Sequence, residues 1–142
     1  MKIHIIARGR IGRSPEGELV ERYMKRLSWP YRITELPDRA SNAPLPPAPP
    51  HSITVAMDEK GKTWRSMEFA QKIGNWQDEG RSEIRFLIGA ADGLREEERA
   101  AADMYFAFGA ATWPHMLARA MLAEQLWRAS AILSGHPYHR EG

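Results

Sequence analysis

At residues 84–93 the chain reads IRFLIGAADG, an apolar run followed by a segment bounded by two glycines. The apolar run predicts a buried strand, and Gly89 to Gly93 predict a tight turn. Helical patterns flank this stretch at residues 66–79 and 94–103. A buried strand between two helices indicates a parallel sheet that helices cover.

The same alternation extends in both directions along the chain. Further strands are expected at residues 2–8, 31–36, 52–57 and 105–109, and further helices after the Ser14-Pro15 start signal and at residues 114–134, with a turn at 59–62. Strands separated by helices predict the α/β class, with a mainly parallel sheet and helices on both faces. The length of 142 residues fits a single domain over 1–142.

A proline-rich segment interrupts this pattern at residues 37–51. Six of the ten prolines lie between Pro37 and Pro50. Because proline cannot donate to a regular hydrogen-bond ladder, we expect an extended, polyproline-like surface connection. We do not expect a domain boundary there, because the 36 preceding residues are too few to fold alone.

Composition excludes several kinds of chemistry. The chain has no cysteine, so disulfides, zinc thiolates and thiol nucleophiles are excluded. No signal peptide is visible, and charged residues interrupt the most apolar long stretch, at 116–133. We therefore expect a cytoplasmic protein with no membrane span.

Positive charge gathers in the N-terminal part of the chain. Residues 1–40 carry nine Lys or Arg against five acidic residues. The group consists of Arg8, Arg10, Arg13, Arg22, Lys25, Arg26, Arg32 and Arg39, together with Lys2. These side chains could face phosphates, or they could form an ordinary solvated surface.

The helix expected at 114–134 is apolar almost all round. Packing on a sheet needs one apolar face, and a second apolar face needs a second partner. We therefore expect a homodimer with this helix at the interface, the alternative being a helix buried within one chain.

Familiar catalytic motifs are absent. The sequence contains no G-x-G-x-x-G, P-loop, H-E-x-x-H or G-x-S-x-G pattern. His136 and His139 lie near Glu141, but no metal site is expected because the sequence places no third ligand.

A ligand is expected at the carboxyl ends of the strands, as in other open parallel sheets. Those ends are Met57-Asp58, Ile88-Gly89 and residues 109–112. Glycine and alanine at two of them would let a ligand approach the backbone closely, although ordinary tight turns would also use such residues.

Four segments of the chain resemble the RlmH family. They read FLIGAADGL at 86–94, TWPH at 112–115, LAEQLWRA at 122–129 and GHPYHRE at 135–141. The resemblance implies a SPOUT fold with a C-terminal trefoil knot, and a homodimer. It also implies methylation, with S-adenosyl-L-methionine as donor, of N3 of a pseudouridine in 23S rRNA on the assembled ribosome.

The resemblance also assigns residues. By position, contacts to S-adenosyl-L-methionine carry over to Met57, Gly89, Phe108, Gly109, Ala110, Ala111, Thr112 and Trp113. The C-terminal tail offers His139 and His136 as candidate bases, Arg140 for a phosphate or developing negative charge, and Tyr138 for stacking or hydrogen bonding. For His115 we expect a structural hydrogen bond.

The chain departs from the family pattern at several positions. It has Ala90, Gly109 and Trp127 where the family often has Gly, Ser and Tyr, and residues 38–51 replace a longer charged helical segment. Two alternatives therefore stay open. The chain could act on another RNA such as tRNA, or it could be a non-catalytic SPOUT protein that binds the ribosome.

Overall fold

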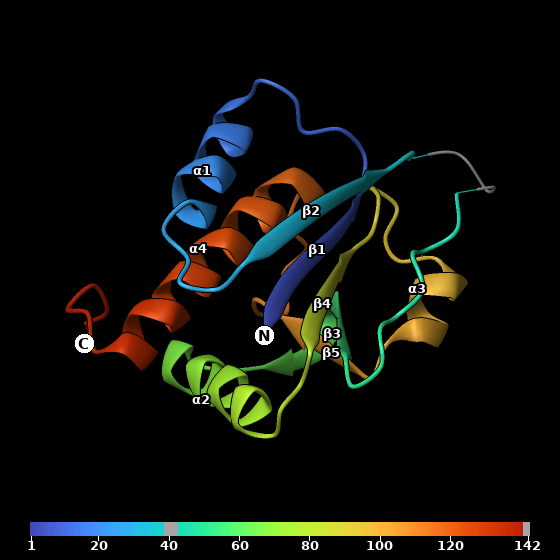
Figure 1. Cartoon of the computed structure of the whole chain (residues 1–142). Helices are drawn as coiled ribbons and strands as arrows, with labels where there is room; N and C mark the ends of the chain where they lie inside the picture. Colours follow the sequence, from blue (N-terminus) through green and yellow to red (C-terminus); the bar gives the residue numbers. More distant parts are fainter. Residues whose placement is uncertain (39–42, 141–142) are drawn as a thin grey trace.

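The structure, a computed structural model, describes residues 1–38 and 43–140. Its elements, in chain order, are β1 (Lys2–Arg8), α1 (Pro15–Met24), β2 (Tyr31–Leu36), β3 (Ile53–Thr63), α2 (Ser66–Asp78), β4 (Glu83–Ile88), α3 (Glu96–Ala101), β5 (Met104–Ala107) and α4 (His115–Ser134). The strands form one sheet of order β2-β1-β4-β3-β5 in which every pairing is parallel (Figure 1). The predicted α/β class is confirmed.

Local sequence signals set several boundaries as predicted. The hydroxyl of Ser14 accepts a hydrogen bond from the Gly17 backbone N–H at 3.0 Å, and Pro15 opens α1. The bounds of β1 and β2 match the predicted strands, and α4 ends directly before Gly135. By contrast, Arg65 rather than Ser66 is the N-cap residue of α2, and its backbone N–H donates to Glu68.

Three helices, α1, α4 and α2, cover one face of the sheet (Figure 1). Helix α4 packs against both α1 and α2, and its Leu122 and Leu126 are fully buried with Ile5 and Phe86 of the sheet. These neighbours account for much of the apolar character of α4 within one chain. Other apolar residues of α4, such as Met121, stay half-buried, and the homodimer stays a prediction.

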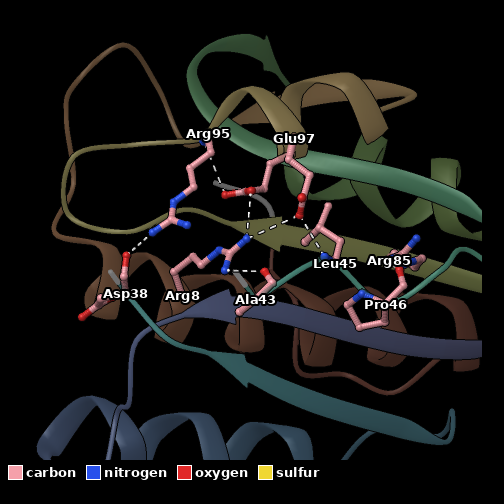
Figure 2. Close-up of polar contacts among 9 residues, drawn as sticks. Arg8, Asp38, Ala43, Leu45, Pro46, Arg85, Arg95 and Glu97 are labelled. Carbon is pink, nitrogen blue, oxygen red and sulfur yellow. Dashed lines mark hydrogen bonds and ion pairs between the residues drawn. The ribbon is translucent and has the colours of Figure 1, made fainter. Parts of the chain in front are cut away.

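The opposite face is covered by α3 and by residues 43–50, which we call the proline strap. Among the described residues, the apolar cluster buried on this face is small and consists of Ile6, Ala56 and Leu87. Arg8 donates a hydrogen bond to the carbonyl of Ala43 at 3.1 Å, and Arg85 donates to that of Pro46 at 2.5 Å (Figure 2). Because prolines offer carbonyls but no N–H groups, arginine donors suit this strap.

The strap is extended and carries no helix or strand over residues 43–49, as predicted. It is more than a surface connection, since it holds two arginines of the sheet. The remaining part of the predicted segment, residues 39–42, lies outside the described residues.

Strand β3 is longer than predicted. The expectation that the strand stops at a turn over residues 59–62 is wrong, because β3 continues to Thr63. Its register against β5 shifts between Met57 and Lys62, which both pair with Phe106, so residues 58–61 bulge out of the ladder. A Cβ atom at Gly61 would lie 2.7 Å from the Phe106 backbone nitrogen, so this close approach requires glycine.

Two other elements are shorter than predicted. Helix α3 covers residues 96–101 of the expected 94–103, and β5 ends at Ala107 rather than Gly109. Residues 108–114 thereby form a loop between β5 and α4. The trefoil knot that the resemblance implies stays a prediction.

Candidate active site

A cavity of about 350 Å³ opens at the carboxyl ends of β3, β4 and β5. The sequence predicts a ligand at these carboxyl ends of the strands. Its walls come from the β3 bulge, the loop after β4, helix α3, and the loop between β5 and the start of α4. The residues that line it fall in three stretches of the chain, within 57–60, 88–99 and 106–118.

Most of the residues assigned to the methyl donor line this cavity. They are Met57, Gly89, Phe108, Gly109, Ala111, Thr112 and Trp113. Ala110 is not among the described residues that line it. The structure therefore gathers the predicted set in one place, while its role in binding stays a prediction.

Gly109 gives the cavity an open stretch of main chain. Its φ of +106° lies in a region that side chains rarely adopt. Among the described residues, no heavy atom outside its chain neighbours lies within 4 Å of a Cβ built there. A ligand can therefore approach this backbone closely. Any side chain at this position would be strained in this conformation.

The β3 bulge adds polar residues that sequence reasoning missed: Glu59 and Lys60, joined by Arg99 of α3. Arg99 donates to Asp58 at 2.8 Å. Burial alone would raise the pKa of Asp58, but hydrogen bonds from Arg99 and from the Lys60 backbone N–H hold that pKa below its ordinary value. Asp58 is therefore a firm anion at neutral pH.

A second hydrogen bond holds the β3 bulge at the cavity. The hydroxyl of Thr112 donates to the carboxylate of Glu59. The bulge is thus fixed to α3 on one side and to the loop after β5 on the other. No alternation of apolar residues reveals such a bulge, because its position depends on pairing with β5.

His115 differs from expectation. It lines the cavity at the first turn of α4, but its Nε2 atom is buried and has no hydrogen-bond partner among the described residues. His115 Nε2 therefore does not make the structural hydrogen bond expected for this residue. A buried polar atom without a partner is costly, and a ligand in the cavity could supply one.

The C-terminal tail packs on the second half of α4. Tyr138 donates its hydroxyl proton to Glu124 at 2.8 Å, and the Arg128 guanidinium lies 4.9 Å from the Tyr138 ring centre. His139 Nδ1 lies 3.0 Å from Arg128 Nη1. His136 packs edge-on against Trp127, with ring centres 5.5 Å apart.

These contacts control the ionisation of Tyr138. Burial and the hydrogen bond to Glu124 raise the pKa of Tyr138 to about 12. The phenol therefore stays protonated at neutral pH. Arg140, the last described residue of the tail, is exposed, and Glu141 lies outside the described residues.

Within one chain the tail and the cavity are separated. Glu124 follows His115 by nine residues, which is roughly 14 Å along the helix axis. None of the described tail residues, 136–140, lines the cavity. The structure therefore does not bring the predicted tail residues to the predicted donor site of the same chain.

The basic N-terminal residues divide into two kinds. Arg8 is 2% exposed and pairs with Glu98 at 3.3 Å, so the idea that Arg8 could face phosphates is wrong. Lys2 is half-buried. Six further members of the group are exposed: Arg10, Arg13, Arg22, Lys25, Arg26 and Arg32. Arg39 lies outside the described residues.

A buried network fixes the loop that carries Arg10 and Arg13. Arg119 of α4, fully buried, donates to Glu35 at 2.5 Å and to the Gly9 carbonyl at 3.1 Å. Glu35 also accepts the backbone N–H of Ile11 at 2.8 Å. Burial would raise the pKa of Glu35, but these hydrogen bonds lower it below its ordinary value.

Two kinds of feature are missing from the part of the chain that the structure describes. Over residues 1–38 and 43–140, no three His, Asp or Glu side chains group as metal ligands would. Among the same residues, no helix combines the length and apolarity that a bilayer crossing needs.

Known proteins place the chain in a family. The family model described as "Predicted SPOUT methyltransferase" matches residues 1–139. The "Ribosomal RNA large subunit methyltransferase H" of Rhizorhabdus wittichii is 66% identical over 142 residues, and the protein of that name from Novosphingobium aromaticivorans is 64% identical. Both alignments cover 100% of this chain and of the relative.

A solved structure agrees on the fold. A probable methylase family protein from Haemophilus influenzae matches with a TM-score of 0.56, covering 99% of this chain and 70% of that one. At 12% identity this likeness concerns the fold alone. The family match and the full-length identities carry further: the chain belongs to the SPOUT methyltransferases and, as its resemblance indicated, to the group named ribosomal RNA large subunit methyltransferase H.

Proposed function

We propose that this methyltransferase transfers a methyl group from S-adenosyl-L-methionine to N3 of a pseudouridine in 23S rRNA, on the assembled ribosome in the cytoplasm. The observation that carries the proposal is identity of 66% over the whole chain with a protein named for methylation of large-subunit rRNA. That alignment covers 100% of this chain and so includes the loop at 108–113, part of which lines the cavity.

The cavity fits the proposed donor. An adenosyl group needs main-chain N–H and C=O groups at close range, and Gly109 leaves such a stretch open. The buried Nε2 of His115, which has no partner among the described residues, is a further polar atom to which the donor could hydrogen-bond. When bound, S-adenosyl-L-methionine supplies an electrophilic methyl group on a sulfonium; Asp58 and Glu59 add negative charge at the cavity wall.

The main contribution of the protein is alignment. Residues 108–113 and Gly89 would hold the donor, and positioning of two reactants can contribute roughly 7–11 kcal/mol to catalysis. The bulge ties Asp58–Arg99 and Glu59–Thr112 keep the cavity walls fixed, which favours one orientation.

The tail would act on the nucleobase. The N3–H of pseudouridine is a weak acid, so stabilising the deprotonated base helps. A guanidinium can only donate, so His139 Nδ1 accepts from Arg128 and the ring hydrogen lies on Nε2. In this arrangement His139 offers a donor rather than a base, which suits stabilisation of negative charge better than proton abstraction. The Tyr138 hydroxyl already donates to Glu124, so Tyr138 would contribute its ring; His136 and Arg140 lie beside them.

A homodimer would bring the two halves of the site together. The tail lies roughly 14 Å or more along α4 from the cavity of its own chain. A two-fold arrangement of two copies can place the tail of each at the cavity of the other. The half-buried apolar residues of α4 leave a surface for such a contact.

The ribosome would be met by the exposed arginines. Arg10 and Arg13 sit on a loop that the Arg119–Glu35 network fixes, so they present charge at defined positions. Phosphate contacts of this kind weaken as salt increases.

The experiment is methylation of purified ribosomes or naked 23S rRNA from a strain that lacks the gene, with nucleoside mass spectrometry as readout. We expect one methylated pseudouridine, on ribosomes only, and calorimetric binding of S-adenosyl-L-methionine. Methylation of tRNA instead would identify another RNA target. Absence of donor binding would contradict an enzymatic role and leave a ribosome-binding protein.

A further inference from the structure

Trp113 lines the cavity and is 42% exposed. We propose that its indole is the platform on which the target nucleobase stacks. This inference rests on the proposed function, because it presupposes an RNA substrate. It assigns to the side chain of Trp113 a role separate from any contact between its main chain and the methyl donor.

The exposure of Trp113 is unusual for its position. The structure has three other large apolar side chains with comparable exposure among the described residues: Tyr31, Met67 and Leu133. None of these lines the cavity. An exposed aromatic ring beside a ligand cavity is a surface that a flat apolar group can cover.

The ring is also held in place. Its Nε1 donates to the carbonyl of Phe108 at 3.4 Å, which spans the loop between β5 and α4. The neighbouring Thr112 is tied to Glu59 of the bulge. A fixed ring loses little entropy when a base stacks on it, so a preorganised platform suits recognition.

Two cationic side chains line the cavity together with the acidic Asp58 and Glu59. Lys60 and Arg99 line the cavity and are exposed, Arg99 being anchored by Asp58. An aromatic face beside cationic side chains is the combination that binds an unpaired nucleotide, with the base on the ring and the phosphate on the cation. A methyl donor bound in the cavity would then lie next to the stacked base.

The test compares variants on ribosomes from the strain that lacks the gene. Trp113→Leu keeps an apolar side chain without the ring, and Trp113→Phe keeps a ring. Tyr31→Leu is the matched control, because it removes an equally exposed ring (40%) at the start of β2, on the opposite edge of the sheet.

We expect Trp113→Leu to lower kcat/KM by about tenfold, chiefly through KM, and Trp113→Phe to lower it less than Trp113→Leu does, because a ring remains. Tyr31→Leu should stay within about twofold. Donor affinity by calorimetry and sedimentation should match the wild type in all three. Unchanged kcat/KM in Trp113→Leu overturns the inference. So does weaker donor binding, which would place the side chain in the donor site, or altered sedimentation, which would place it between copies. A wild-type protein that binds no donor would refute the proposed function instead.

Discussion

His4 is a buried histidine on the sheet face under the proline strap. It is 4% exposed, its Nε2 lies 2.7 Å from the Thr34 hydroxyl, and its Nδ1 lies 3.5 Å from a carboxylate oxygen of Glu83. Burial lowers the pKa of His4 below its ordinary 6.5 and outweighs the opposing effect of Glu83. The folded state therefore favours neutral His4.

This histidine gives the fold a pH dependence of predictable sign. Below pH 6.5 the unfolded chain binds a proton that the folded chain resists, so stability falls as pH decreases. The contribution of His4 to the slope of unfolding free energy against pH cannot exceed that of one proton, about 1.4 kcal/mol per pH unit. We expect urea unfolding to show a larger loss of stability between pH 7.5 and 5.5 in the wild type than in His4→Gln.

The comparison of the two pH responses removes other effects. Any pH-independent cost of His4→Gln cancels. Glu35 and Asp58, whose pKa values are lowered, lose their contributions at more acidic pH, as pH falls through the ordinary carboxyl range and below it. Equal pH responses in the two proteins would mean that His4 titrates normally in the fold.

At the scale of elements, the sequence predicts what local periodicity controls. Strands β1 and β2 alternate or carry apolar runs between clear stops, and α1 has its own cap, so their bounds could be derived from the residues. The position of a cavity at the strand ends follows from the parallel sheet. The residues assigned to it came from resemblance, and most of them line it.

What the sequence does not predict depends on distant partners. The β3 bulge exists because Met57 and Lys62 both pair with Phe106, which no pattern within β3 encodes. Arg8 looked like a surface cation because its partner Glu98 lies 90 residues away. Lys60 and Arg99 entered the site only through these long-range contacts.

The bulge can be tested at Gly61. Gly61→Ala would place a Cβ 2.7 Å from the backbone of Phe106, so we expect a loss of about 2–3 kcal/mol in stability and weaker donor binding. Gly80→Ala is the control: Gly80 has a φ of +80° and open space around its Cβ, so only about 1 kcal/mol of backbone strain is expected. Denaturant unfolding and calorimetry measure both. Equal behaviour of the two variants would argue against a tight bulge.

The strap and α3 can be tested through two adjacent glutamates that share Arg8. Glu98 is 1% exposed and lies 3.3 Å from Arg8. The Glu97 side chain is 49% exposed and lies 3.6 Å from Arg8 (Figure 2). Breaking the buried pair leaves the buried charge of Arg8 with only the more exposed Glu97 beside it, so we expect Glu98→Gln to cost about 3 kcal/mol. Glu97→Gln should cost less than about 1 kcal/mol.

Adding Arg8→Met to Glu98→Gln separates pairing from packing. If the buried charge causes the loss, removal of both charges should restore part of the stability, giving a coupling of about 1 kcal/mol or more in the double-mutant cycle. If the losses of unfolding free energy are additive, the two side chains stabilise the fold by packing alone and not by pairing their charges.

At the scale of the whole molecule, the separation of tail and cavity has a consequence for how two copies would assemble. One chain holds a cavity at the start of α4 and a tail folded on its second half. If both take part in the reaction, each active site must combine the cavity of one copy with the tail of the other. Sedimentation should then give a dimer, and dilution into monomers should abolish activity without abolishing the fold.

Mixed dimers distinguish this arrangement from one in which the tail acts within its own chain. Gly109→Val would fill the open space in the cavity, and a joint change of Tyr138→Ala and His139→Ala would remove the tail groups. Each variant alone should be inactive. Mixed and re-equilibrated, a mixed dimer has one intact cavity facing the one intact tail, so about a quarter of the wild-type activity should return. A tail that serves its own chain would find only damaged cavities, because every intact cavity would belong to a chain without a tail, and no activity would return at any mixing ratio.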